Sequence, residues 1–253
     1  MNSNAPFGGA RKLWSHIYGK HKGFLCIAYA VRNLDDNGVP IKKGDNATRE
    51  FTNKFYHYPE EVDEALAYVH KVNSVPRNEV WFSKSLYKTR RRGNDNVVGC
   101  GALAVELDGP PLPDGKLKPT AVVLSSPAHL NDDEKDHYHP YFAIDPSTPI
   151  DRAGELNRRL GKKLGGEKRE LSGLLRIPGT LNWKHPEEPV AELLYLDDSR
   201  RFDEYVLDSL LPEEEEREYT RPSGGMIPKG ATPQVRHFGR PPTWRSEGEP
   251  RRT

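Results

Sequence analysis

The sequence predicts an α+β fold built around an antiparallel sheet. Three apolar stretches with strand character follow one another in the middle of the chain: Gly101–Asp108, Thr120–Ser126 and His137–Ile144. A helix is predicted next, because apolar residues recur at the three- and four-residue spacing of a buried helix face: Ile150, Ala153, Leu156, Leu160 and Leu164. A further strand is predicted at Val190–Leu196. Strands, a helix and a further strand are the content of a ferredoxin-like, or RNA-recognition-like, antiparallel sheet.

The first part of the chain predicts a separate module. A short helix is predicted at Lys12–Tyr18, and strands at Phe24–Val31 and Glu79–Ser83. Between the strands, a helix beginning at Pro59 has apolar residues at helical spacing, namely Val62, Ala65, Leu66, Val69 and Val72. We therefore expect residues 11–100 to form an N-terminal α/β module.

The two ends of the chain differ in composition from the part between them. Residues 1–10 are small and polar, and we expect a loose N-terminus there. From Glu213 the chain is acidic and then rich in Pro, Gly and Arg, with little periodic hydrophobicity. Residues 213–253 are therefore predicted to be a disordered tail or a linker. The second module, which contains the three central strands and a short helix at Phe202–Leu211, covers residues 101–212.

Composition and charge exclude several classes of protein. Of 253 residues, 35% are hydrophobic and 30% are charged, and the net charge is +1. This balance excludes a uniformly basic, histone-like binder but not a local basic groove. Cys26 and Cys100 are too few for a disulfide framework or a four-cysteine zinc site, which indicates a reducing compartment. No apolar run reaches the roughly 18 residues that span a bilayer, and no signal peptide precedes the fold. We expect a cytoplasmic protein with no membrane partner.

Two acids end the first central strand. Strand side chains alternate, so Leu103, Val105 and Leu107 point one way while Glu106 and Asp108 point the other. The two acids are about 6.7 Å apart along the strand, at about 3.3 Å per residue. Carboxylates on one face repel each other unless a cation lies between them, and oxygen ligands at this spacing suit Mg²⁺ or Mn²⁺. The alternative is a solvated strand end before a Gly-Pro-Pro turn, because acid-x-acid pairs are common by chance.

A basic cluster lies in the loop before this strand. Its members are Lys88, Arg90, Arg91 and Arg92, followed by a glycine. Basic clusters supply the sequence-independent part of nucleic-acid affinity, so these residues are predicted to bind DNA phosphates. The alternative is a solvated basic loop, which is what most charge runs are.

Three stretches together resemble the archaeo-eukaryotic primase superfamily, in particular the primase-polymerases of plasmids, phages and integrated elements. The strand ending in Glu106 and Asp108 is similar to the first motif of that family, acid-x-acid. The stretch SSPAHLNDDEKDHYHPYF is similar to the second, in which a small polar residue stands shortly before a histidine; the matching residues are Ser126 and His139. The stretch ELSGLLRIPGTLNWK matches the third almost residue for residue. The resemblance covers residues 11–212.

The resemblance implies a primase-like catalytic core, with a palm module over residues 101–212. It implies that two divalent ions, Mg²⁺ or Mn²⁺, are bound by three acids: Glu106, Asp108 and Glu170. It implies that the nucleotide is bound by Ser126, His139, Arg176 and Lys184. The implied partners are a single-stranded DNA template, nucleoside triphosphates and a replicative helicase of the same mobile element. The implied reaction is two-metal nucleotidyl transfer by a DNA primase-polymerase.

The chain departs from the family pattern at two acids. The family usually has Asp where this chain has Glu106 and Glu170. Glutamate reaches one methylene further and can still bind a divalent ion. Glu167 and Asp151 are alternative candidates for the third ligand.

Two other functions stay open. His137 and His139 resemble the metal-binding histidine pair of HUH-type Rep endonucleases, with Tyr68 of a Tyr-x-x-Lys sequence as the nucleophile. The order of these elements is reversed relative to that family, and Tyr68 lies within the predicted helix. The two glutamates in place of aspartates also fit a catalytically inactive, nucleic-acid-binding relic.

Overall fold

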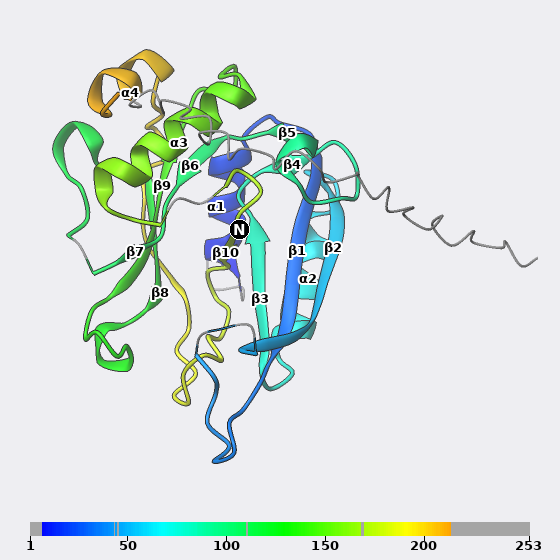
Figure 1. The fold of residues 1–253 in the computed structure, drawn as a ribbon. Helices are drawn as coiled ribbons and strands as arrows, with labels where there is room; N and C mark the ends of the chain where they lie inside the picture. Colours follow the sequence, from blue (N-terminus) through cyan, green and yellow to red (C-terminus); the bar gives the residue numbers. More distant parts are fainter. Residues whose placement is uncertain (1–6, 43, 45, 110, 168–169, 214–253) are drawn as a thin grey trace, which may run out of the picture. The chain divides into compact units, whose positions relative to one another are not determined.

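The computed structural model describes residues 7–42, 44, 46–109, 111–167 and 170–213. These residues belong to one compact unit that extends to Glu214. Two antiparallel sheets and the helices packed on them make up this unit (Figure 1). The predicted mixture of helices and antiparallel strands is confirmed.

The larger sheet has the strand order β10-β3-β1-β4-β5, and β2 pairs with β1. Its strands are β1 (Gly23–Arg32), β2 (Thr48–Tyr58), β3 (Asn78–Ser83), β4 (Leu86–Tyr87), β5 (Val97–Gly99) and β10 (Leu174–Arg176). Residue Ala28 of β1 is paired with Asn53 of β2 and with Trp81 of β3, so β2 and β3 lie on opposite edges of β1. The last strand in the chain order, β10, forms the edge beside β3.

The smaller sheet has the order β11-β8-β9-β6, and β7 also pairs with β9. Its strands are β6 (Ala102–Ala104), β7 (Leu107–Asp108), β8 (Ala121–Ser126), β9 (His137–Ala143) and β11 (Glu192–Leu196). The predicted antiparallel pairing of the second and third central strands is confirmed in β8 and β9. The ferredoxin-like arrangement is not confirmed and stays a prediction. The strand that follows α3 in the chain is β10, and it joins the larger sheet instead of this one.

Four α-helices complete the described fold. They are α1 (Gly8–Tyr18), α2 (Val62–Asn73), α3 (Ile150–Leu164) and α4 (Glu204–Leu210). Short 3-10 turns occur at Asn94–Asn96, Gly115–Leu117 and Ala128–Leu130. None of the helices in the described ranges is long and apolar enough to span a bilayer.

The first hydrophobic core lies between the two sheets, around α1. Trp14 of α1 packs against Phe82 of β3 with ring centroids 5.8 Å apart, and Phe82 stacks on Tyr141 of β9 at 6.5 Å. Leu25 and Ile27 of β1 belong to the same core, with side chains of both α1 and α2. The two helices therefore cover one face of the larger sheet, and the opposite face is left without a helix among the described elements.

The second core lies between the smaller sheet and α3 with α4. Leu103, Val105 and Leu107 all belong to it, while Ala104 belongs to the first core. The alternation predicted for Gly101–Asp108 is therefore correct. The stretch is not one continuous strand, however: β6 ends at Ala104, β7 begins at Leu107, and Glu106 between them forms a bridge with Glu167.

Several element boundaries differ from the predictions. The helix predicted to begin at Pro59 begins at Val62, because the backbone N–H of Glu61 is bound to the carbonyl of His57 at 2.7 Å in a preceding turn. The first helix begins at Gly8, within the predicted loose N-terminus. The predicted division near residue 100 stays a prediction, and the predicted tail lies outside the described residues from 214 onwards.

Candidate active site

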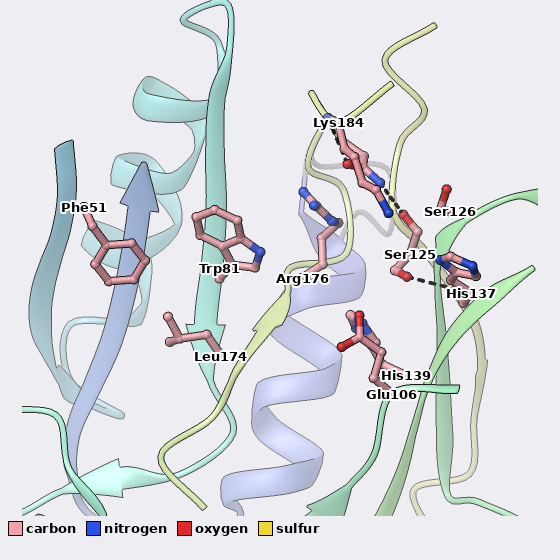
Figure 2. Close-up of a pocket in the computed structure, with 11 residues that line it drawn as sticks. Phe51, Trp81, Glu106, Ser125, Ser126, His137, His139, Leu174, Arg176 and Lys184 are labelled. Atoms are coloured by element: carbon pink, nitrogen blue, oxygen red, sulfur yellow. Dashed lines mark hydrogen bonds and ion pairs between the residues drawn. The ribbon is translucent and has the colours of Figure 1, made fainter. Parts of the chain in front are cut away.

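A cavity of about 290 Å³ opens where β10 meets the inner face of the smaller sheet. Phe51 and Trp81 lie on one side of it and Ser126 and His137 on the other, as Figure 2 shows. Further side chains on its wall are Glu106, Ser125, His139, Arg176, Asn182 and Lys184. Residues from all three motif-like stretches therefore reach one cavity.

Glu106 enters the cavity from the link between β6 and β7. Its Oε1 atom lies 3.7 Å from Nε2 of His139 on β9, and the two side chains are 22% and 5% exposed. Burial, and then the positive charge of Arg176, lowers the pKa of His139 to about 3, although Asp108 acts in the opposite direction. His139 is therefore neutral at pH 7 and offers one N–H donor and one acceptor nitrogen.

Asp108 lies on the same face, at the end of β7. Its Oδ1 atom is 3.5 Å from Nδ1 of His137, the residue opposite it on β9. The other ring nitrogen of His137 is 3.3 Å from Asp133. A second cavity of about 80 Å³ lies beside this pair and shares His137 and Lys184 with the first. The two acids thus face adjoining cavities, each with a histidine beside it.

Ser126 is held by two buried neighbours. The amide nitrogen of Asn131 donates to the carbonyls of Ser126, Pro127 and Lys135, so its side-chain oxygen faces the hydroxyl of Ser126 at 2.7 Å. Ser126 donates to that oxygen and accepts from Nε2 of His185 at 2.8 Å. The serine hydroxyl predicted to bind the nucleotide is therefore already satisfied by the protein.

Arg176 is fixed by a buried carboxylate. Its guanidinium contacts Glu79 of β3, which is completely buried and also binds Arg32 at 2.8 Å. The two guanidiniums share one carboxylate, so Glu79 does not neutralise both of them. The Arg176 guanidinium also lies 5.8 Å from the ring of Trp81, its cross-strand partner. The side chain is therefore oriented before any ligand arrives.

Lys184, in the loop after β10, lines both cavities. The loop turns at Gly179, whose φ of 92° favours glycine. The side chain of Asn182 donates to the carbonyl of Ser125 at 2.9 Å and accepts from the backbone N–H of Lys184 at 3.2 Å. The Asn in this motif therefore joins the loop to β8, and it fixes the backbone of the lysine.

The predicted third acid lies apart from the other two. Glu170 is exposed, and its carboxylate accepts a hydrogen bond from Asn94 at 2.5 Å. It is not among the described residues that line either cavity. The backbone N–H of Glu167 donates to the carbonyl of Glu106 at 3.0 Å, and Asp151 lies in the first turn of α3. Two of the three predicted acids are brought together, and the role of Glu170 stays a prediction.

The predicted DNA-binding residues have different surroundings. Arg91 forms an exposed salt bridge with Asp95 at 2.6 Å. Arg90 and Arg92 instead lie over aromatic rings of the larger sheet, and the Arg92 guanidinium is 5.3 Å from the ring of Phe51. Three members of the cluster are exposed: Lys88, Arg90 and Arg91. Phe51 lines the cavity, so Arg92 joins the basic loop to the site.

The donors at the two cavities fit a hard divalent cation. Glu106 and Asp108 supply carboxylate oxygens from one face of the sheet. Within the ranges that the structure describes, no group of three or more His, Cys, Asp or Glu side chains is placed to hold one ion. Mg²⁺ commonly takes one or two carboxylates from the protein and its other ligands from water and substrate phosphates. Each of the two carboxylates is therefore a ligand of the type that such an ion takes from a protein.

Sequence reasoning missed four residues of this region: Phe51, Glu79, Trp81 and His185. A signal for two of them is present, because Val80 and Phe82 are buried and strand alternation then places Glu79 and Trp81 on the other face. No comparable signal marks Phe51, which lies in a polar stretch.

No protein-family model and no curated protein matches the sequence. Solved structures do match the fold. The primase RepB' matches with a TM-score of 0.52 and 14% identity, over 81% of this chain and 62% of RepB'. The catalytic domain of RepB' in complex with initiator DNA matches with a TM-score of 0.49 and 14% identity, over 79% of this chain and 89% of that chain. The AEP domain of the Cyanophage S-2L primase-polymerase matches with a TM-score of 0.47 and 13% identity, over 74% and 89% of the two chains.

This chain has the fold of the primase RepB'. The resemblance predicted from the three motif-like stretches is thus confirmed at the level of the fold. The primase-fold chain described here spans 62% of the length of RepB'.

Proposed function

We propose that this primase-fold chain synthesises nucleic acid on a single-stranded DNA template, as a primase-polymerase of a mobile element. One observation carries the proposal: side chains from three separated stretches line a single cavity. Glu106 comes from the first stretch, His139 from the second and Lys184 from the third. Acidic and cationic groups together suit a substrate whose triphosphate is brought in with divalent cations.

Glu106 and Asp108 are proposed to hold Mg²⁺ or Mn²⁺, with Glu170 as a third ligand on the strength of its motif. The chemistry that two such ions supply, when bound, is stabilisation of the attacking 3′-hydroxyl oxygen and the leaving pyrophosphate. The chain's own part is to present the carboxylates. Glu106 and Asp108 lie on one face of the sheet, and both are beside β9.

The triphosphate is proposed to be bound by Arg176, Lys184 and His139. Arg176 brings a planar, pre-oriented guanidinium, and Lys184 brings a point charge. The neutral His139 can donate one hydrogen bond to a phosphate oxygen. Ser126 is proposed to contribute by shaping the wall, since its hydroxyl is engaged by Asn131 and His185.

The template is proposed to bind along the basic loop at Lys88–Arg92. Phosphates of single-stranded DNA would meet the exposed arginines there, and binding should weaken as salt increases. A replicative helicase is the partner that would supply an unwound template.

The test is a combined primer-extension and de novo priming assay on single-stranded DNA with Mg²⁺ or Mn²⁺. We expect product with the wild type and none with Glu106→Gln, although both proteins bind the template equally. Template binding without incorporation by the wild type, under every metal and nucleotide tried, would identify the inactive relic instead.

The HUH-endonuclease alternative requires Tyr68 to reach the histidine pair. Tyr68 lies on α2, where its ring packs near Tyr29 and Tyr56 on the helix-covered side of the larger sheet. His137 and His139 line the cavity beside β10. The geometry therefore favours the primase proposal, and a covalent DNA adduct that disappears in Tyr68→Phe would reverse this preference.

A further inference from the structure

The larger sheet carries two stacked aromatic rings on the face that no described helix covers. The rings of Phe51 on β2 and Trp81 on β3 have centroids 6.2 Å apart and planes inclined by 23° (Figure 2). Their strands are not neighbours, because β1 lies between them. The β1 residue paired with Trp81 is Ala28, whose small side chain lets the two rings approach each other across the middle strand.

Packing of the protein does not account for this pair. Among the described residues, both hydrophobic cores exclude Phe51 and Trp81. Phe51 is 49% exposed and lies on a strand whose neighbouring residues are exposed and polar. Trp81 is partly buried. An aromatic pair that is accessible at the wall of a cavity is typical of an interaction surface.

A guanidinium flanks each ring. Arg92 lies 5.3 Å from the centroid of Phe51, and Arg176 lies 5.8 Å from that of Trp81. The four groups therefore form a line, in the order Arg92, Phe51, Trp81, Arg176. Phe51, Trp81 and Arg176 line the cavity, and Arg92 connects this row of groups to the basic loop. Aromatic faces flanked by cations suit a single nucleic-acid strand, whose flat bases alternate with charged phosphates.

We propose that Phe51 and Trp81 form a stacking platform for bases of the single-stranded template, with Arg92 beside the phosphates. This assignment rests on the proposed function, which supplies the template. The base of an incoming nucleotide has the same ring chemistry, but a single nucleotide does not extend over the whole row of four groups. The line continues past Phe51 to Arg92 and the basic loop, where only a longer strand would follow it.

The test distinguishes binding through the bases of the strand from binding through its phosphates. Fluorescence anisotropy in EDTA, without nucleotide, compares an oligothymidine of about 20 nucleotides with an abasic strand of the same length and charge. We expect Phe51→Ala to weaken oligothymidine binding by about tenfold, which corresponds to about 1.4 kcal/mol, and to leave the abasic strand unaffected. Trp81→Leu should do the same, whereas Trp81→Phe should retain most of the affinity because it keeps an aromatic face.

Two control variants accompany these. Tyr205→Ala removes a 74% exposed aromatic ring from α4 and should change the binding of neither strand. Arg90→Gln removes a charge from the basic loop and should weaken both strands alike. Thermal unfolding of each variant checks that the fold is intact.

Two results would overturn the platform. Phe51→Ala could bind oligothymidine like the wild type, or lose affinity for both strands equally. In the first case, a loss of nucleotide affinity in the same variant would assign the rings to the incoming base. The proposed function can fail independently of the platform. If the wild type binds oligothymidine through these rings but makes no product, the platform is supported and the polymerase activity is not.

Discussion

Arg176 and Glu79 face each other on adjacent strands in an ion pair whose side chains are only 8% and 0% exposed. Glu79 also binds Arg32, so its removal leaves two guanidiniums in the interior without their counter-ion. We expect Glu79→Ala to lower the free energy of unfolding by about 3–5 kcal/mol, measured by urea denaturation. Asp95→Ala breaks the exposed pair with Arg91 and should change stability little. Equal effects of the two variants on stability would show that the two buried guanidiniums do not need Glu79 as their counter-ion.

Glu106 and Asp108 should be essential for nucleotide incorporation and dispensable for template binding. Glu106→Gln and Asp108→Asn keep the side-chain size and remove the charge. We expect each to reduce the rate of nucleotide incorporation by about 100-fold or more, because transition-state charge then lacks its compensating cations. The matched control is Asp114→Asn, an exposed acid in the turn after β7, which should be fully active. Normal incorporation by either cavity variant would remove that residue from the proposed metal site.

The third acid can be assigned by comparing two neighbours. The motif resemblance favours Glu170, although its carboxylate is bound to Asn94 away from the cavities. If Glu170 swings to the metals when substrate binds, Glu170→Gln should abolish incorporation and Glu167→Gln should not. Primer extension at several Mn²⁺ concentrations measures both. The reverse pattern would transfer the role to Glu167, whose backbone is bound to that of Glu106.

Alternating apolar strands were predictable from the sequence because burial imposes their pattern. Glu106 and Asp108 were placed on the correct face for this reason, although the break at Glu106 was not foreseen. Strand β2 was missed because it is an edge strand with long exposed stretches, so it has no apolar alternation. The stack of Phe51 on Trp81 depends on three strands meeting in register, which no local pattern encodes.

Nucleotide binding should depend on side chains from separate segments of the cavity wall. We expect His139→Ala and Lys184→Ala each to weaken nucleotide affinity by about tenfold, since a phosphate oxygen that loses its donor costs about 1–3 kcal/mol. Isothermal titration with a nonhydrolysable nucleotide measures this loss. Binding of oligothymidine without nucleotide should not change. A variant that binds nucleotide normally but loses the oligothymidine would show that the triphosphate pocket is misplaced.

His185 should make stability fall in mild acid. It is 1% exposed, and burial, followed by the nearby charges of Lys184 and Lys42, lowers its pKa to about 4. The unfolded chain takes up this proton near pH 6.5 and the folded chain only near pH 4, so the unfolded state binds more protons between these values. Stability contributed by the neutral ring is therefore complete above pH 6.5 and is lost as the pH falls towards 4.

Urea denaturation at about pH 7.5, 6.0 and 5.0, which span this window, measures the effect. The free energy of unfolding should decline less steeply with falling pH in His185→Gln than in the wild type. His129→Gln, at an exposed position, should follow the wild type. A decline as steep in His185→Gln as in the wild type would mean that protonation of other groups drives the loss of stability.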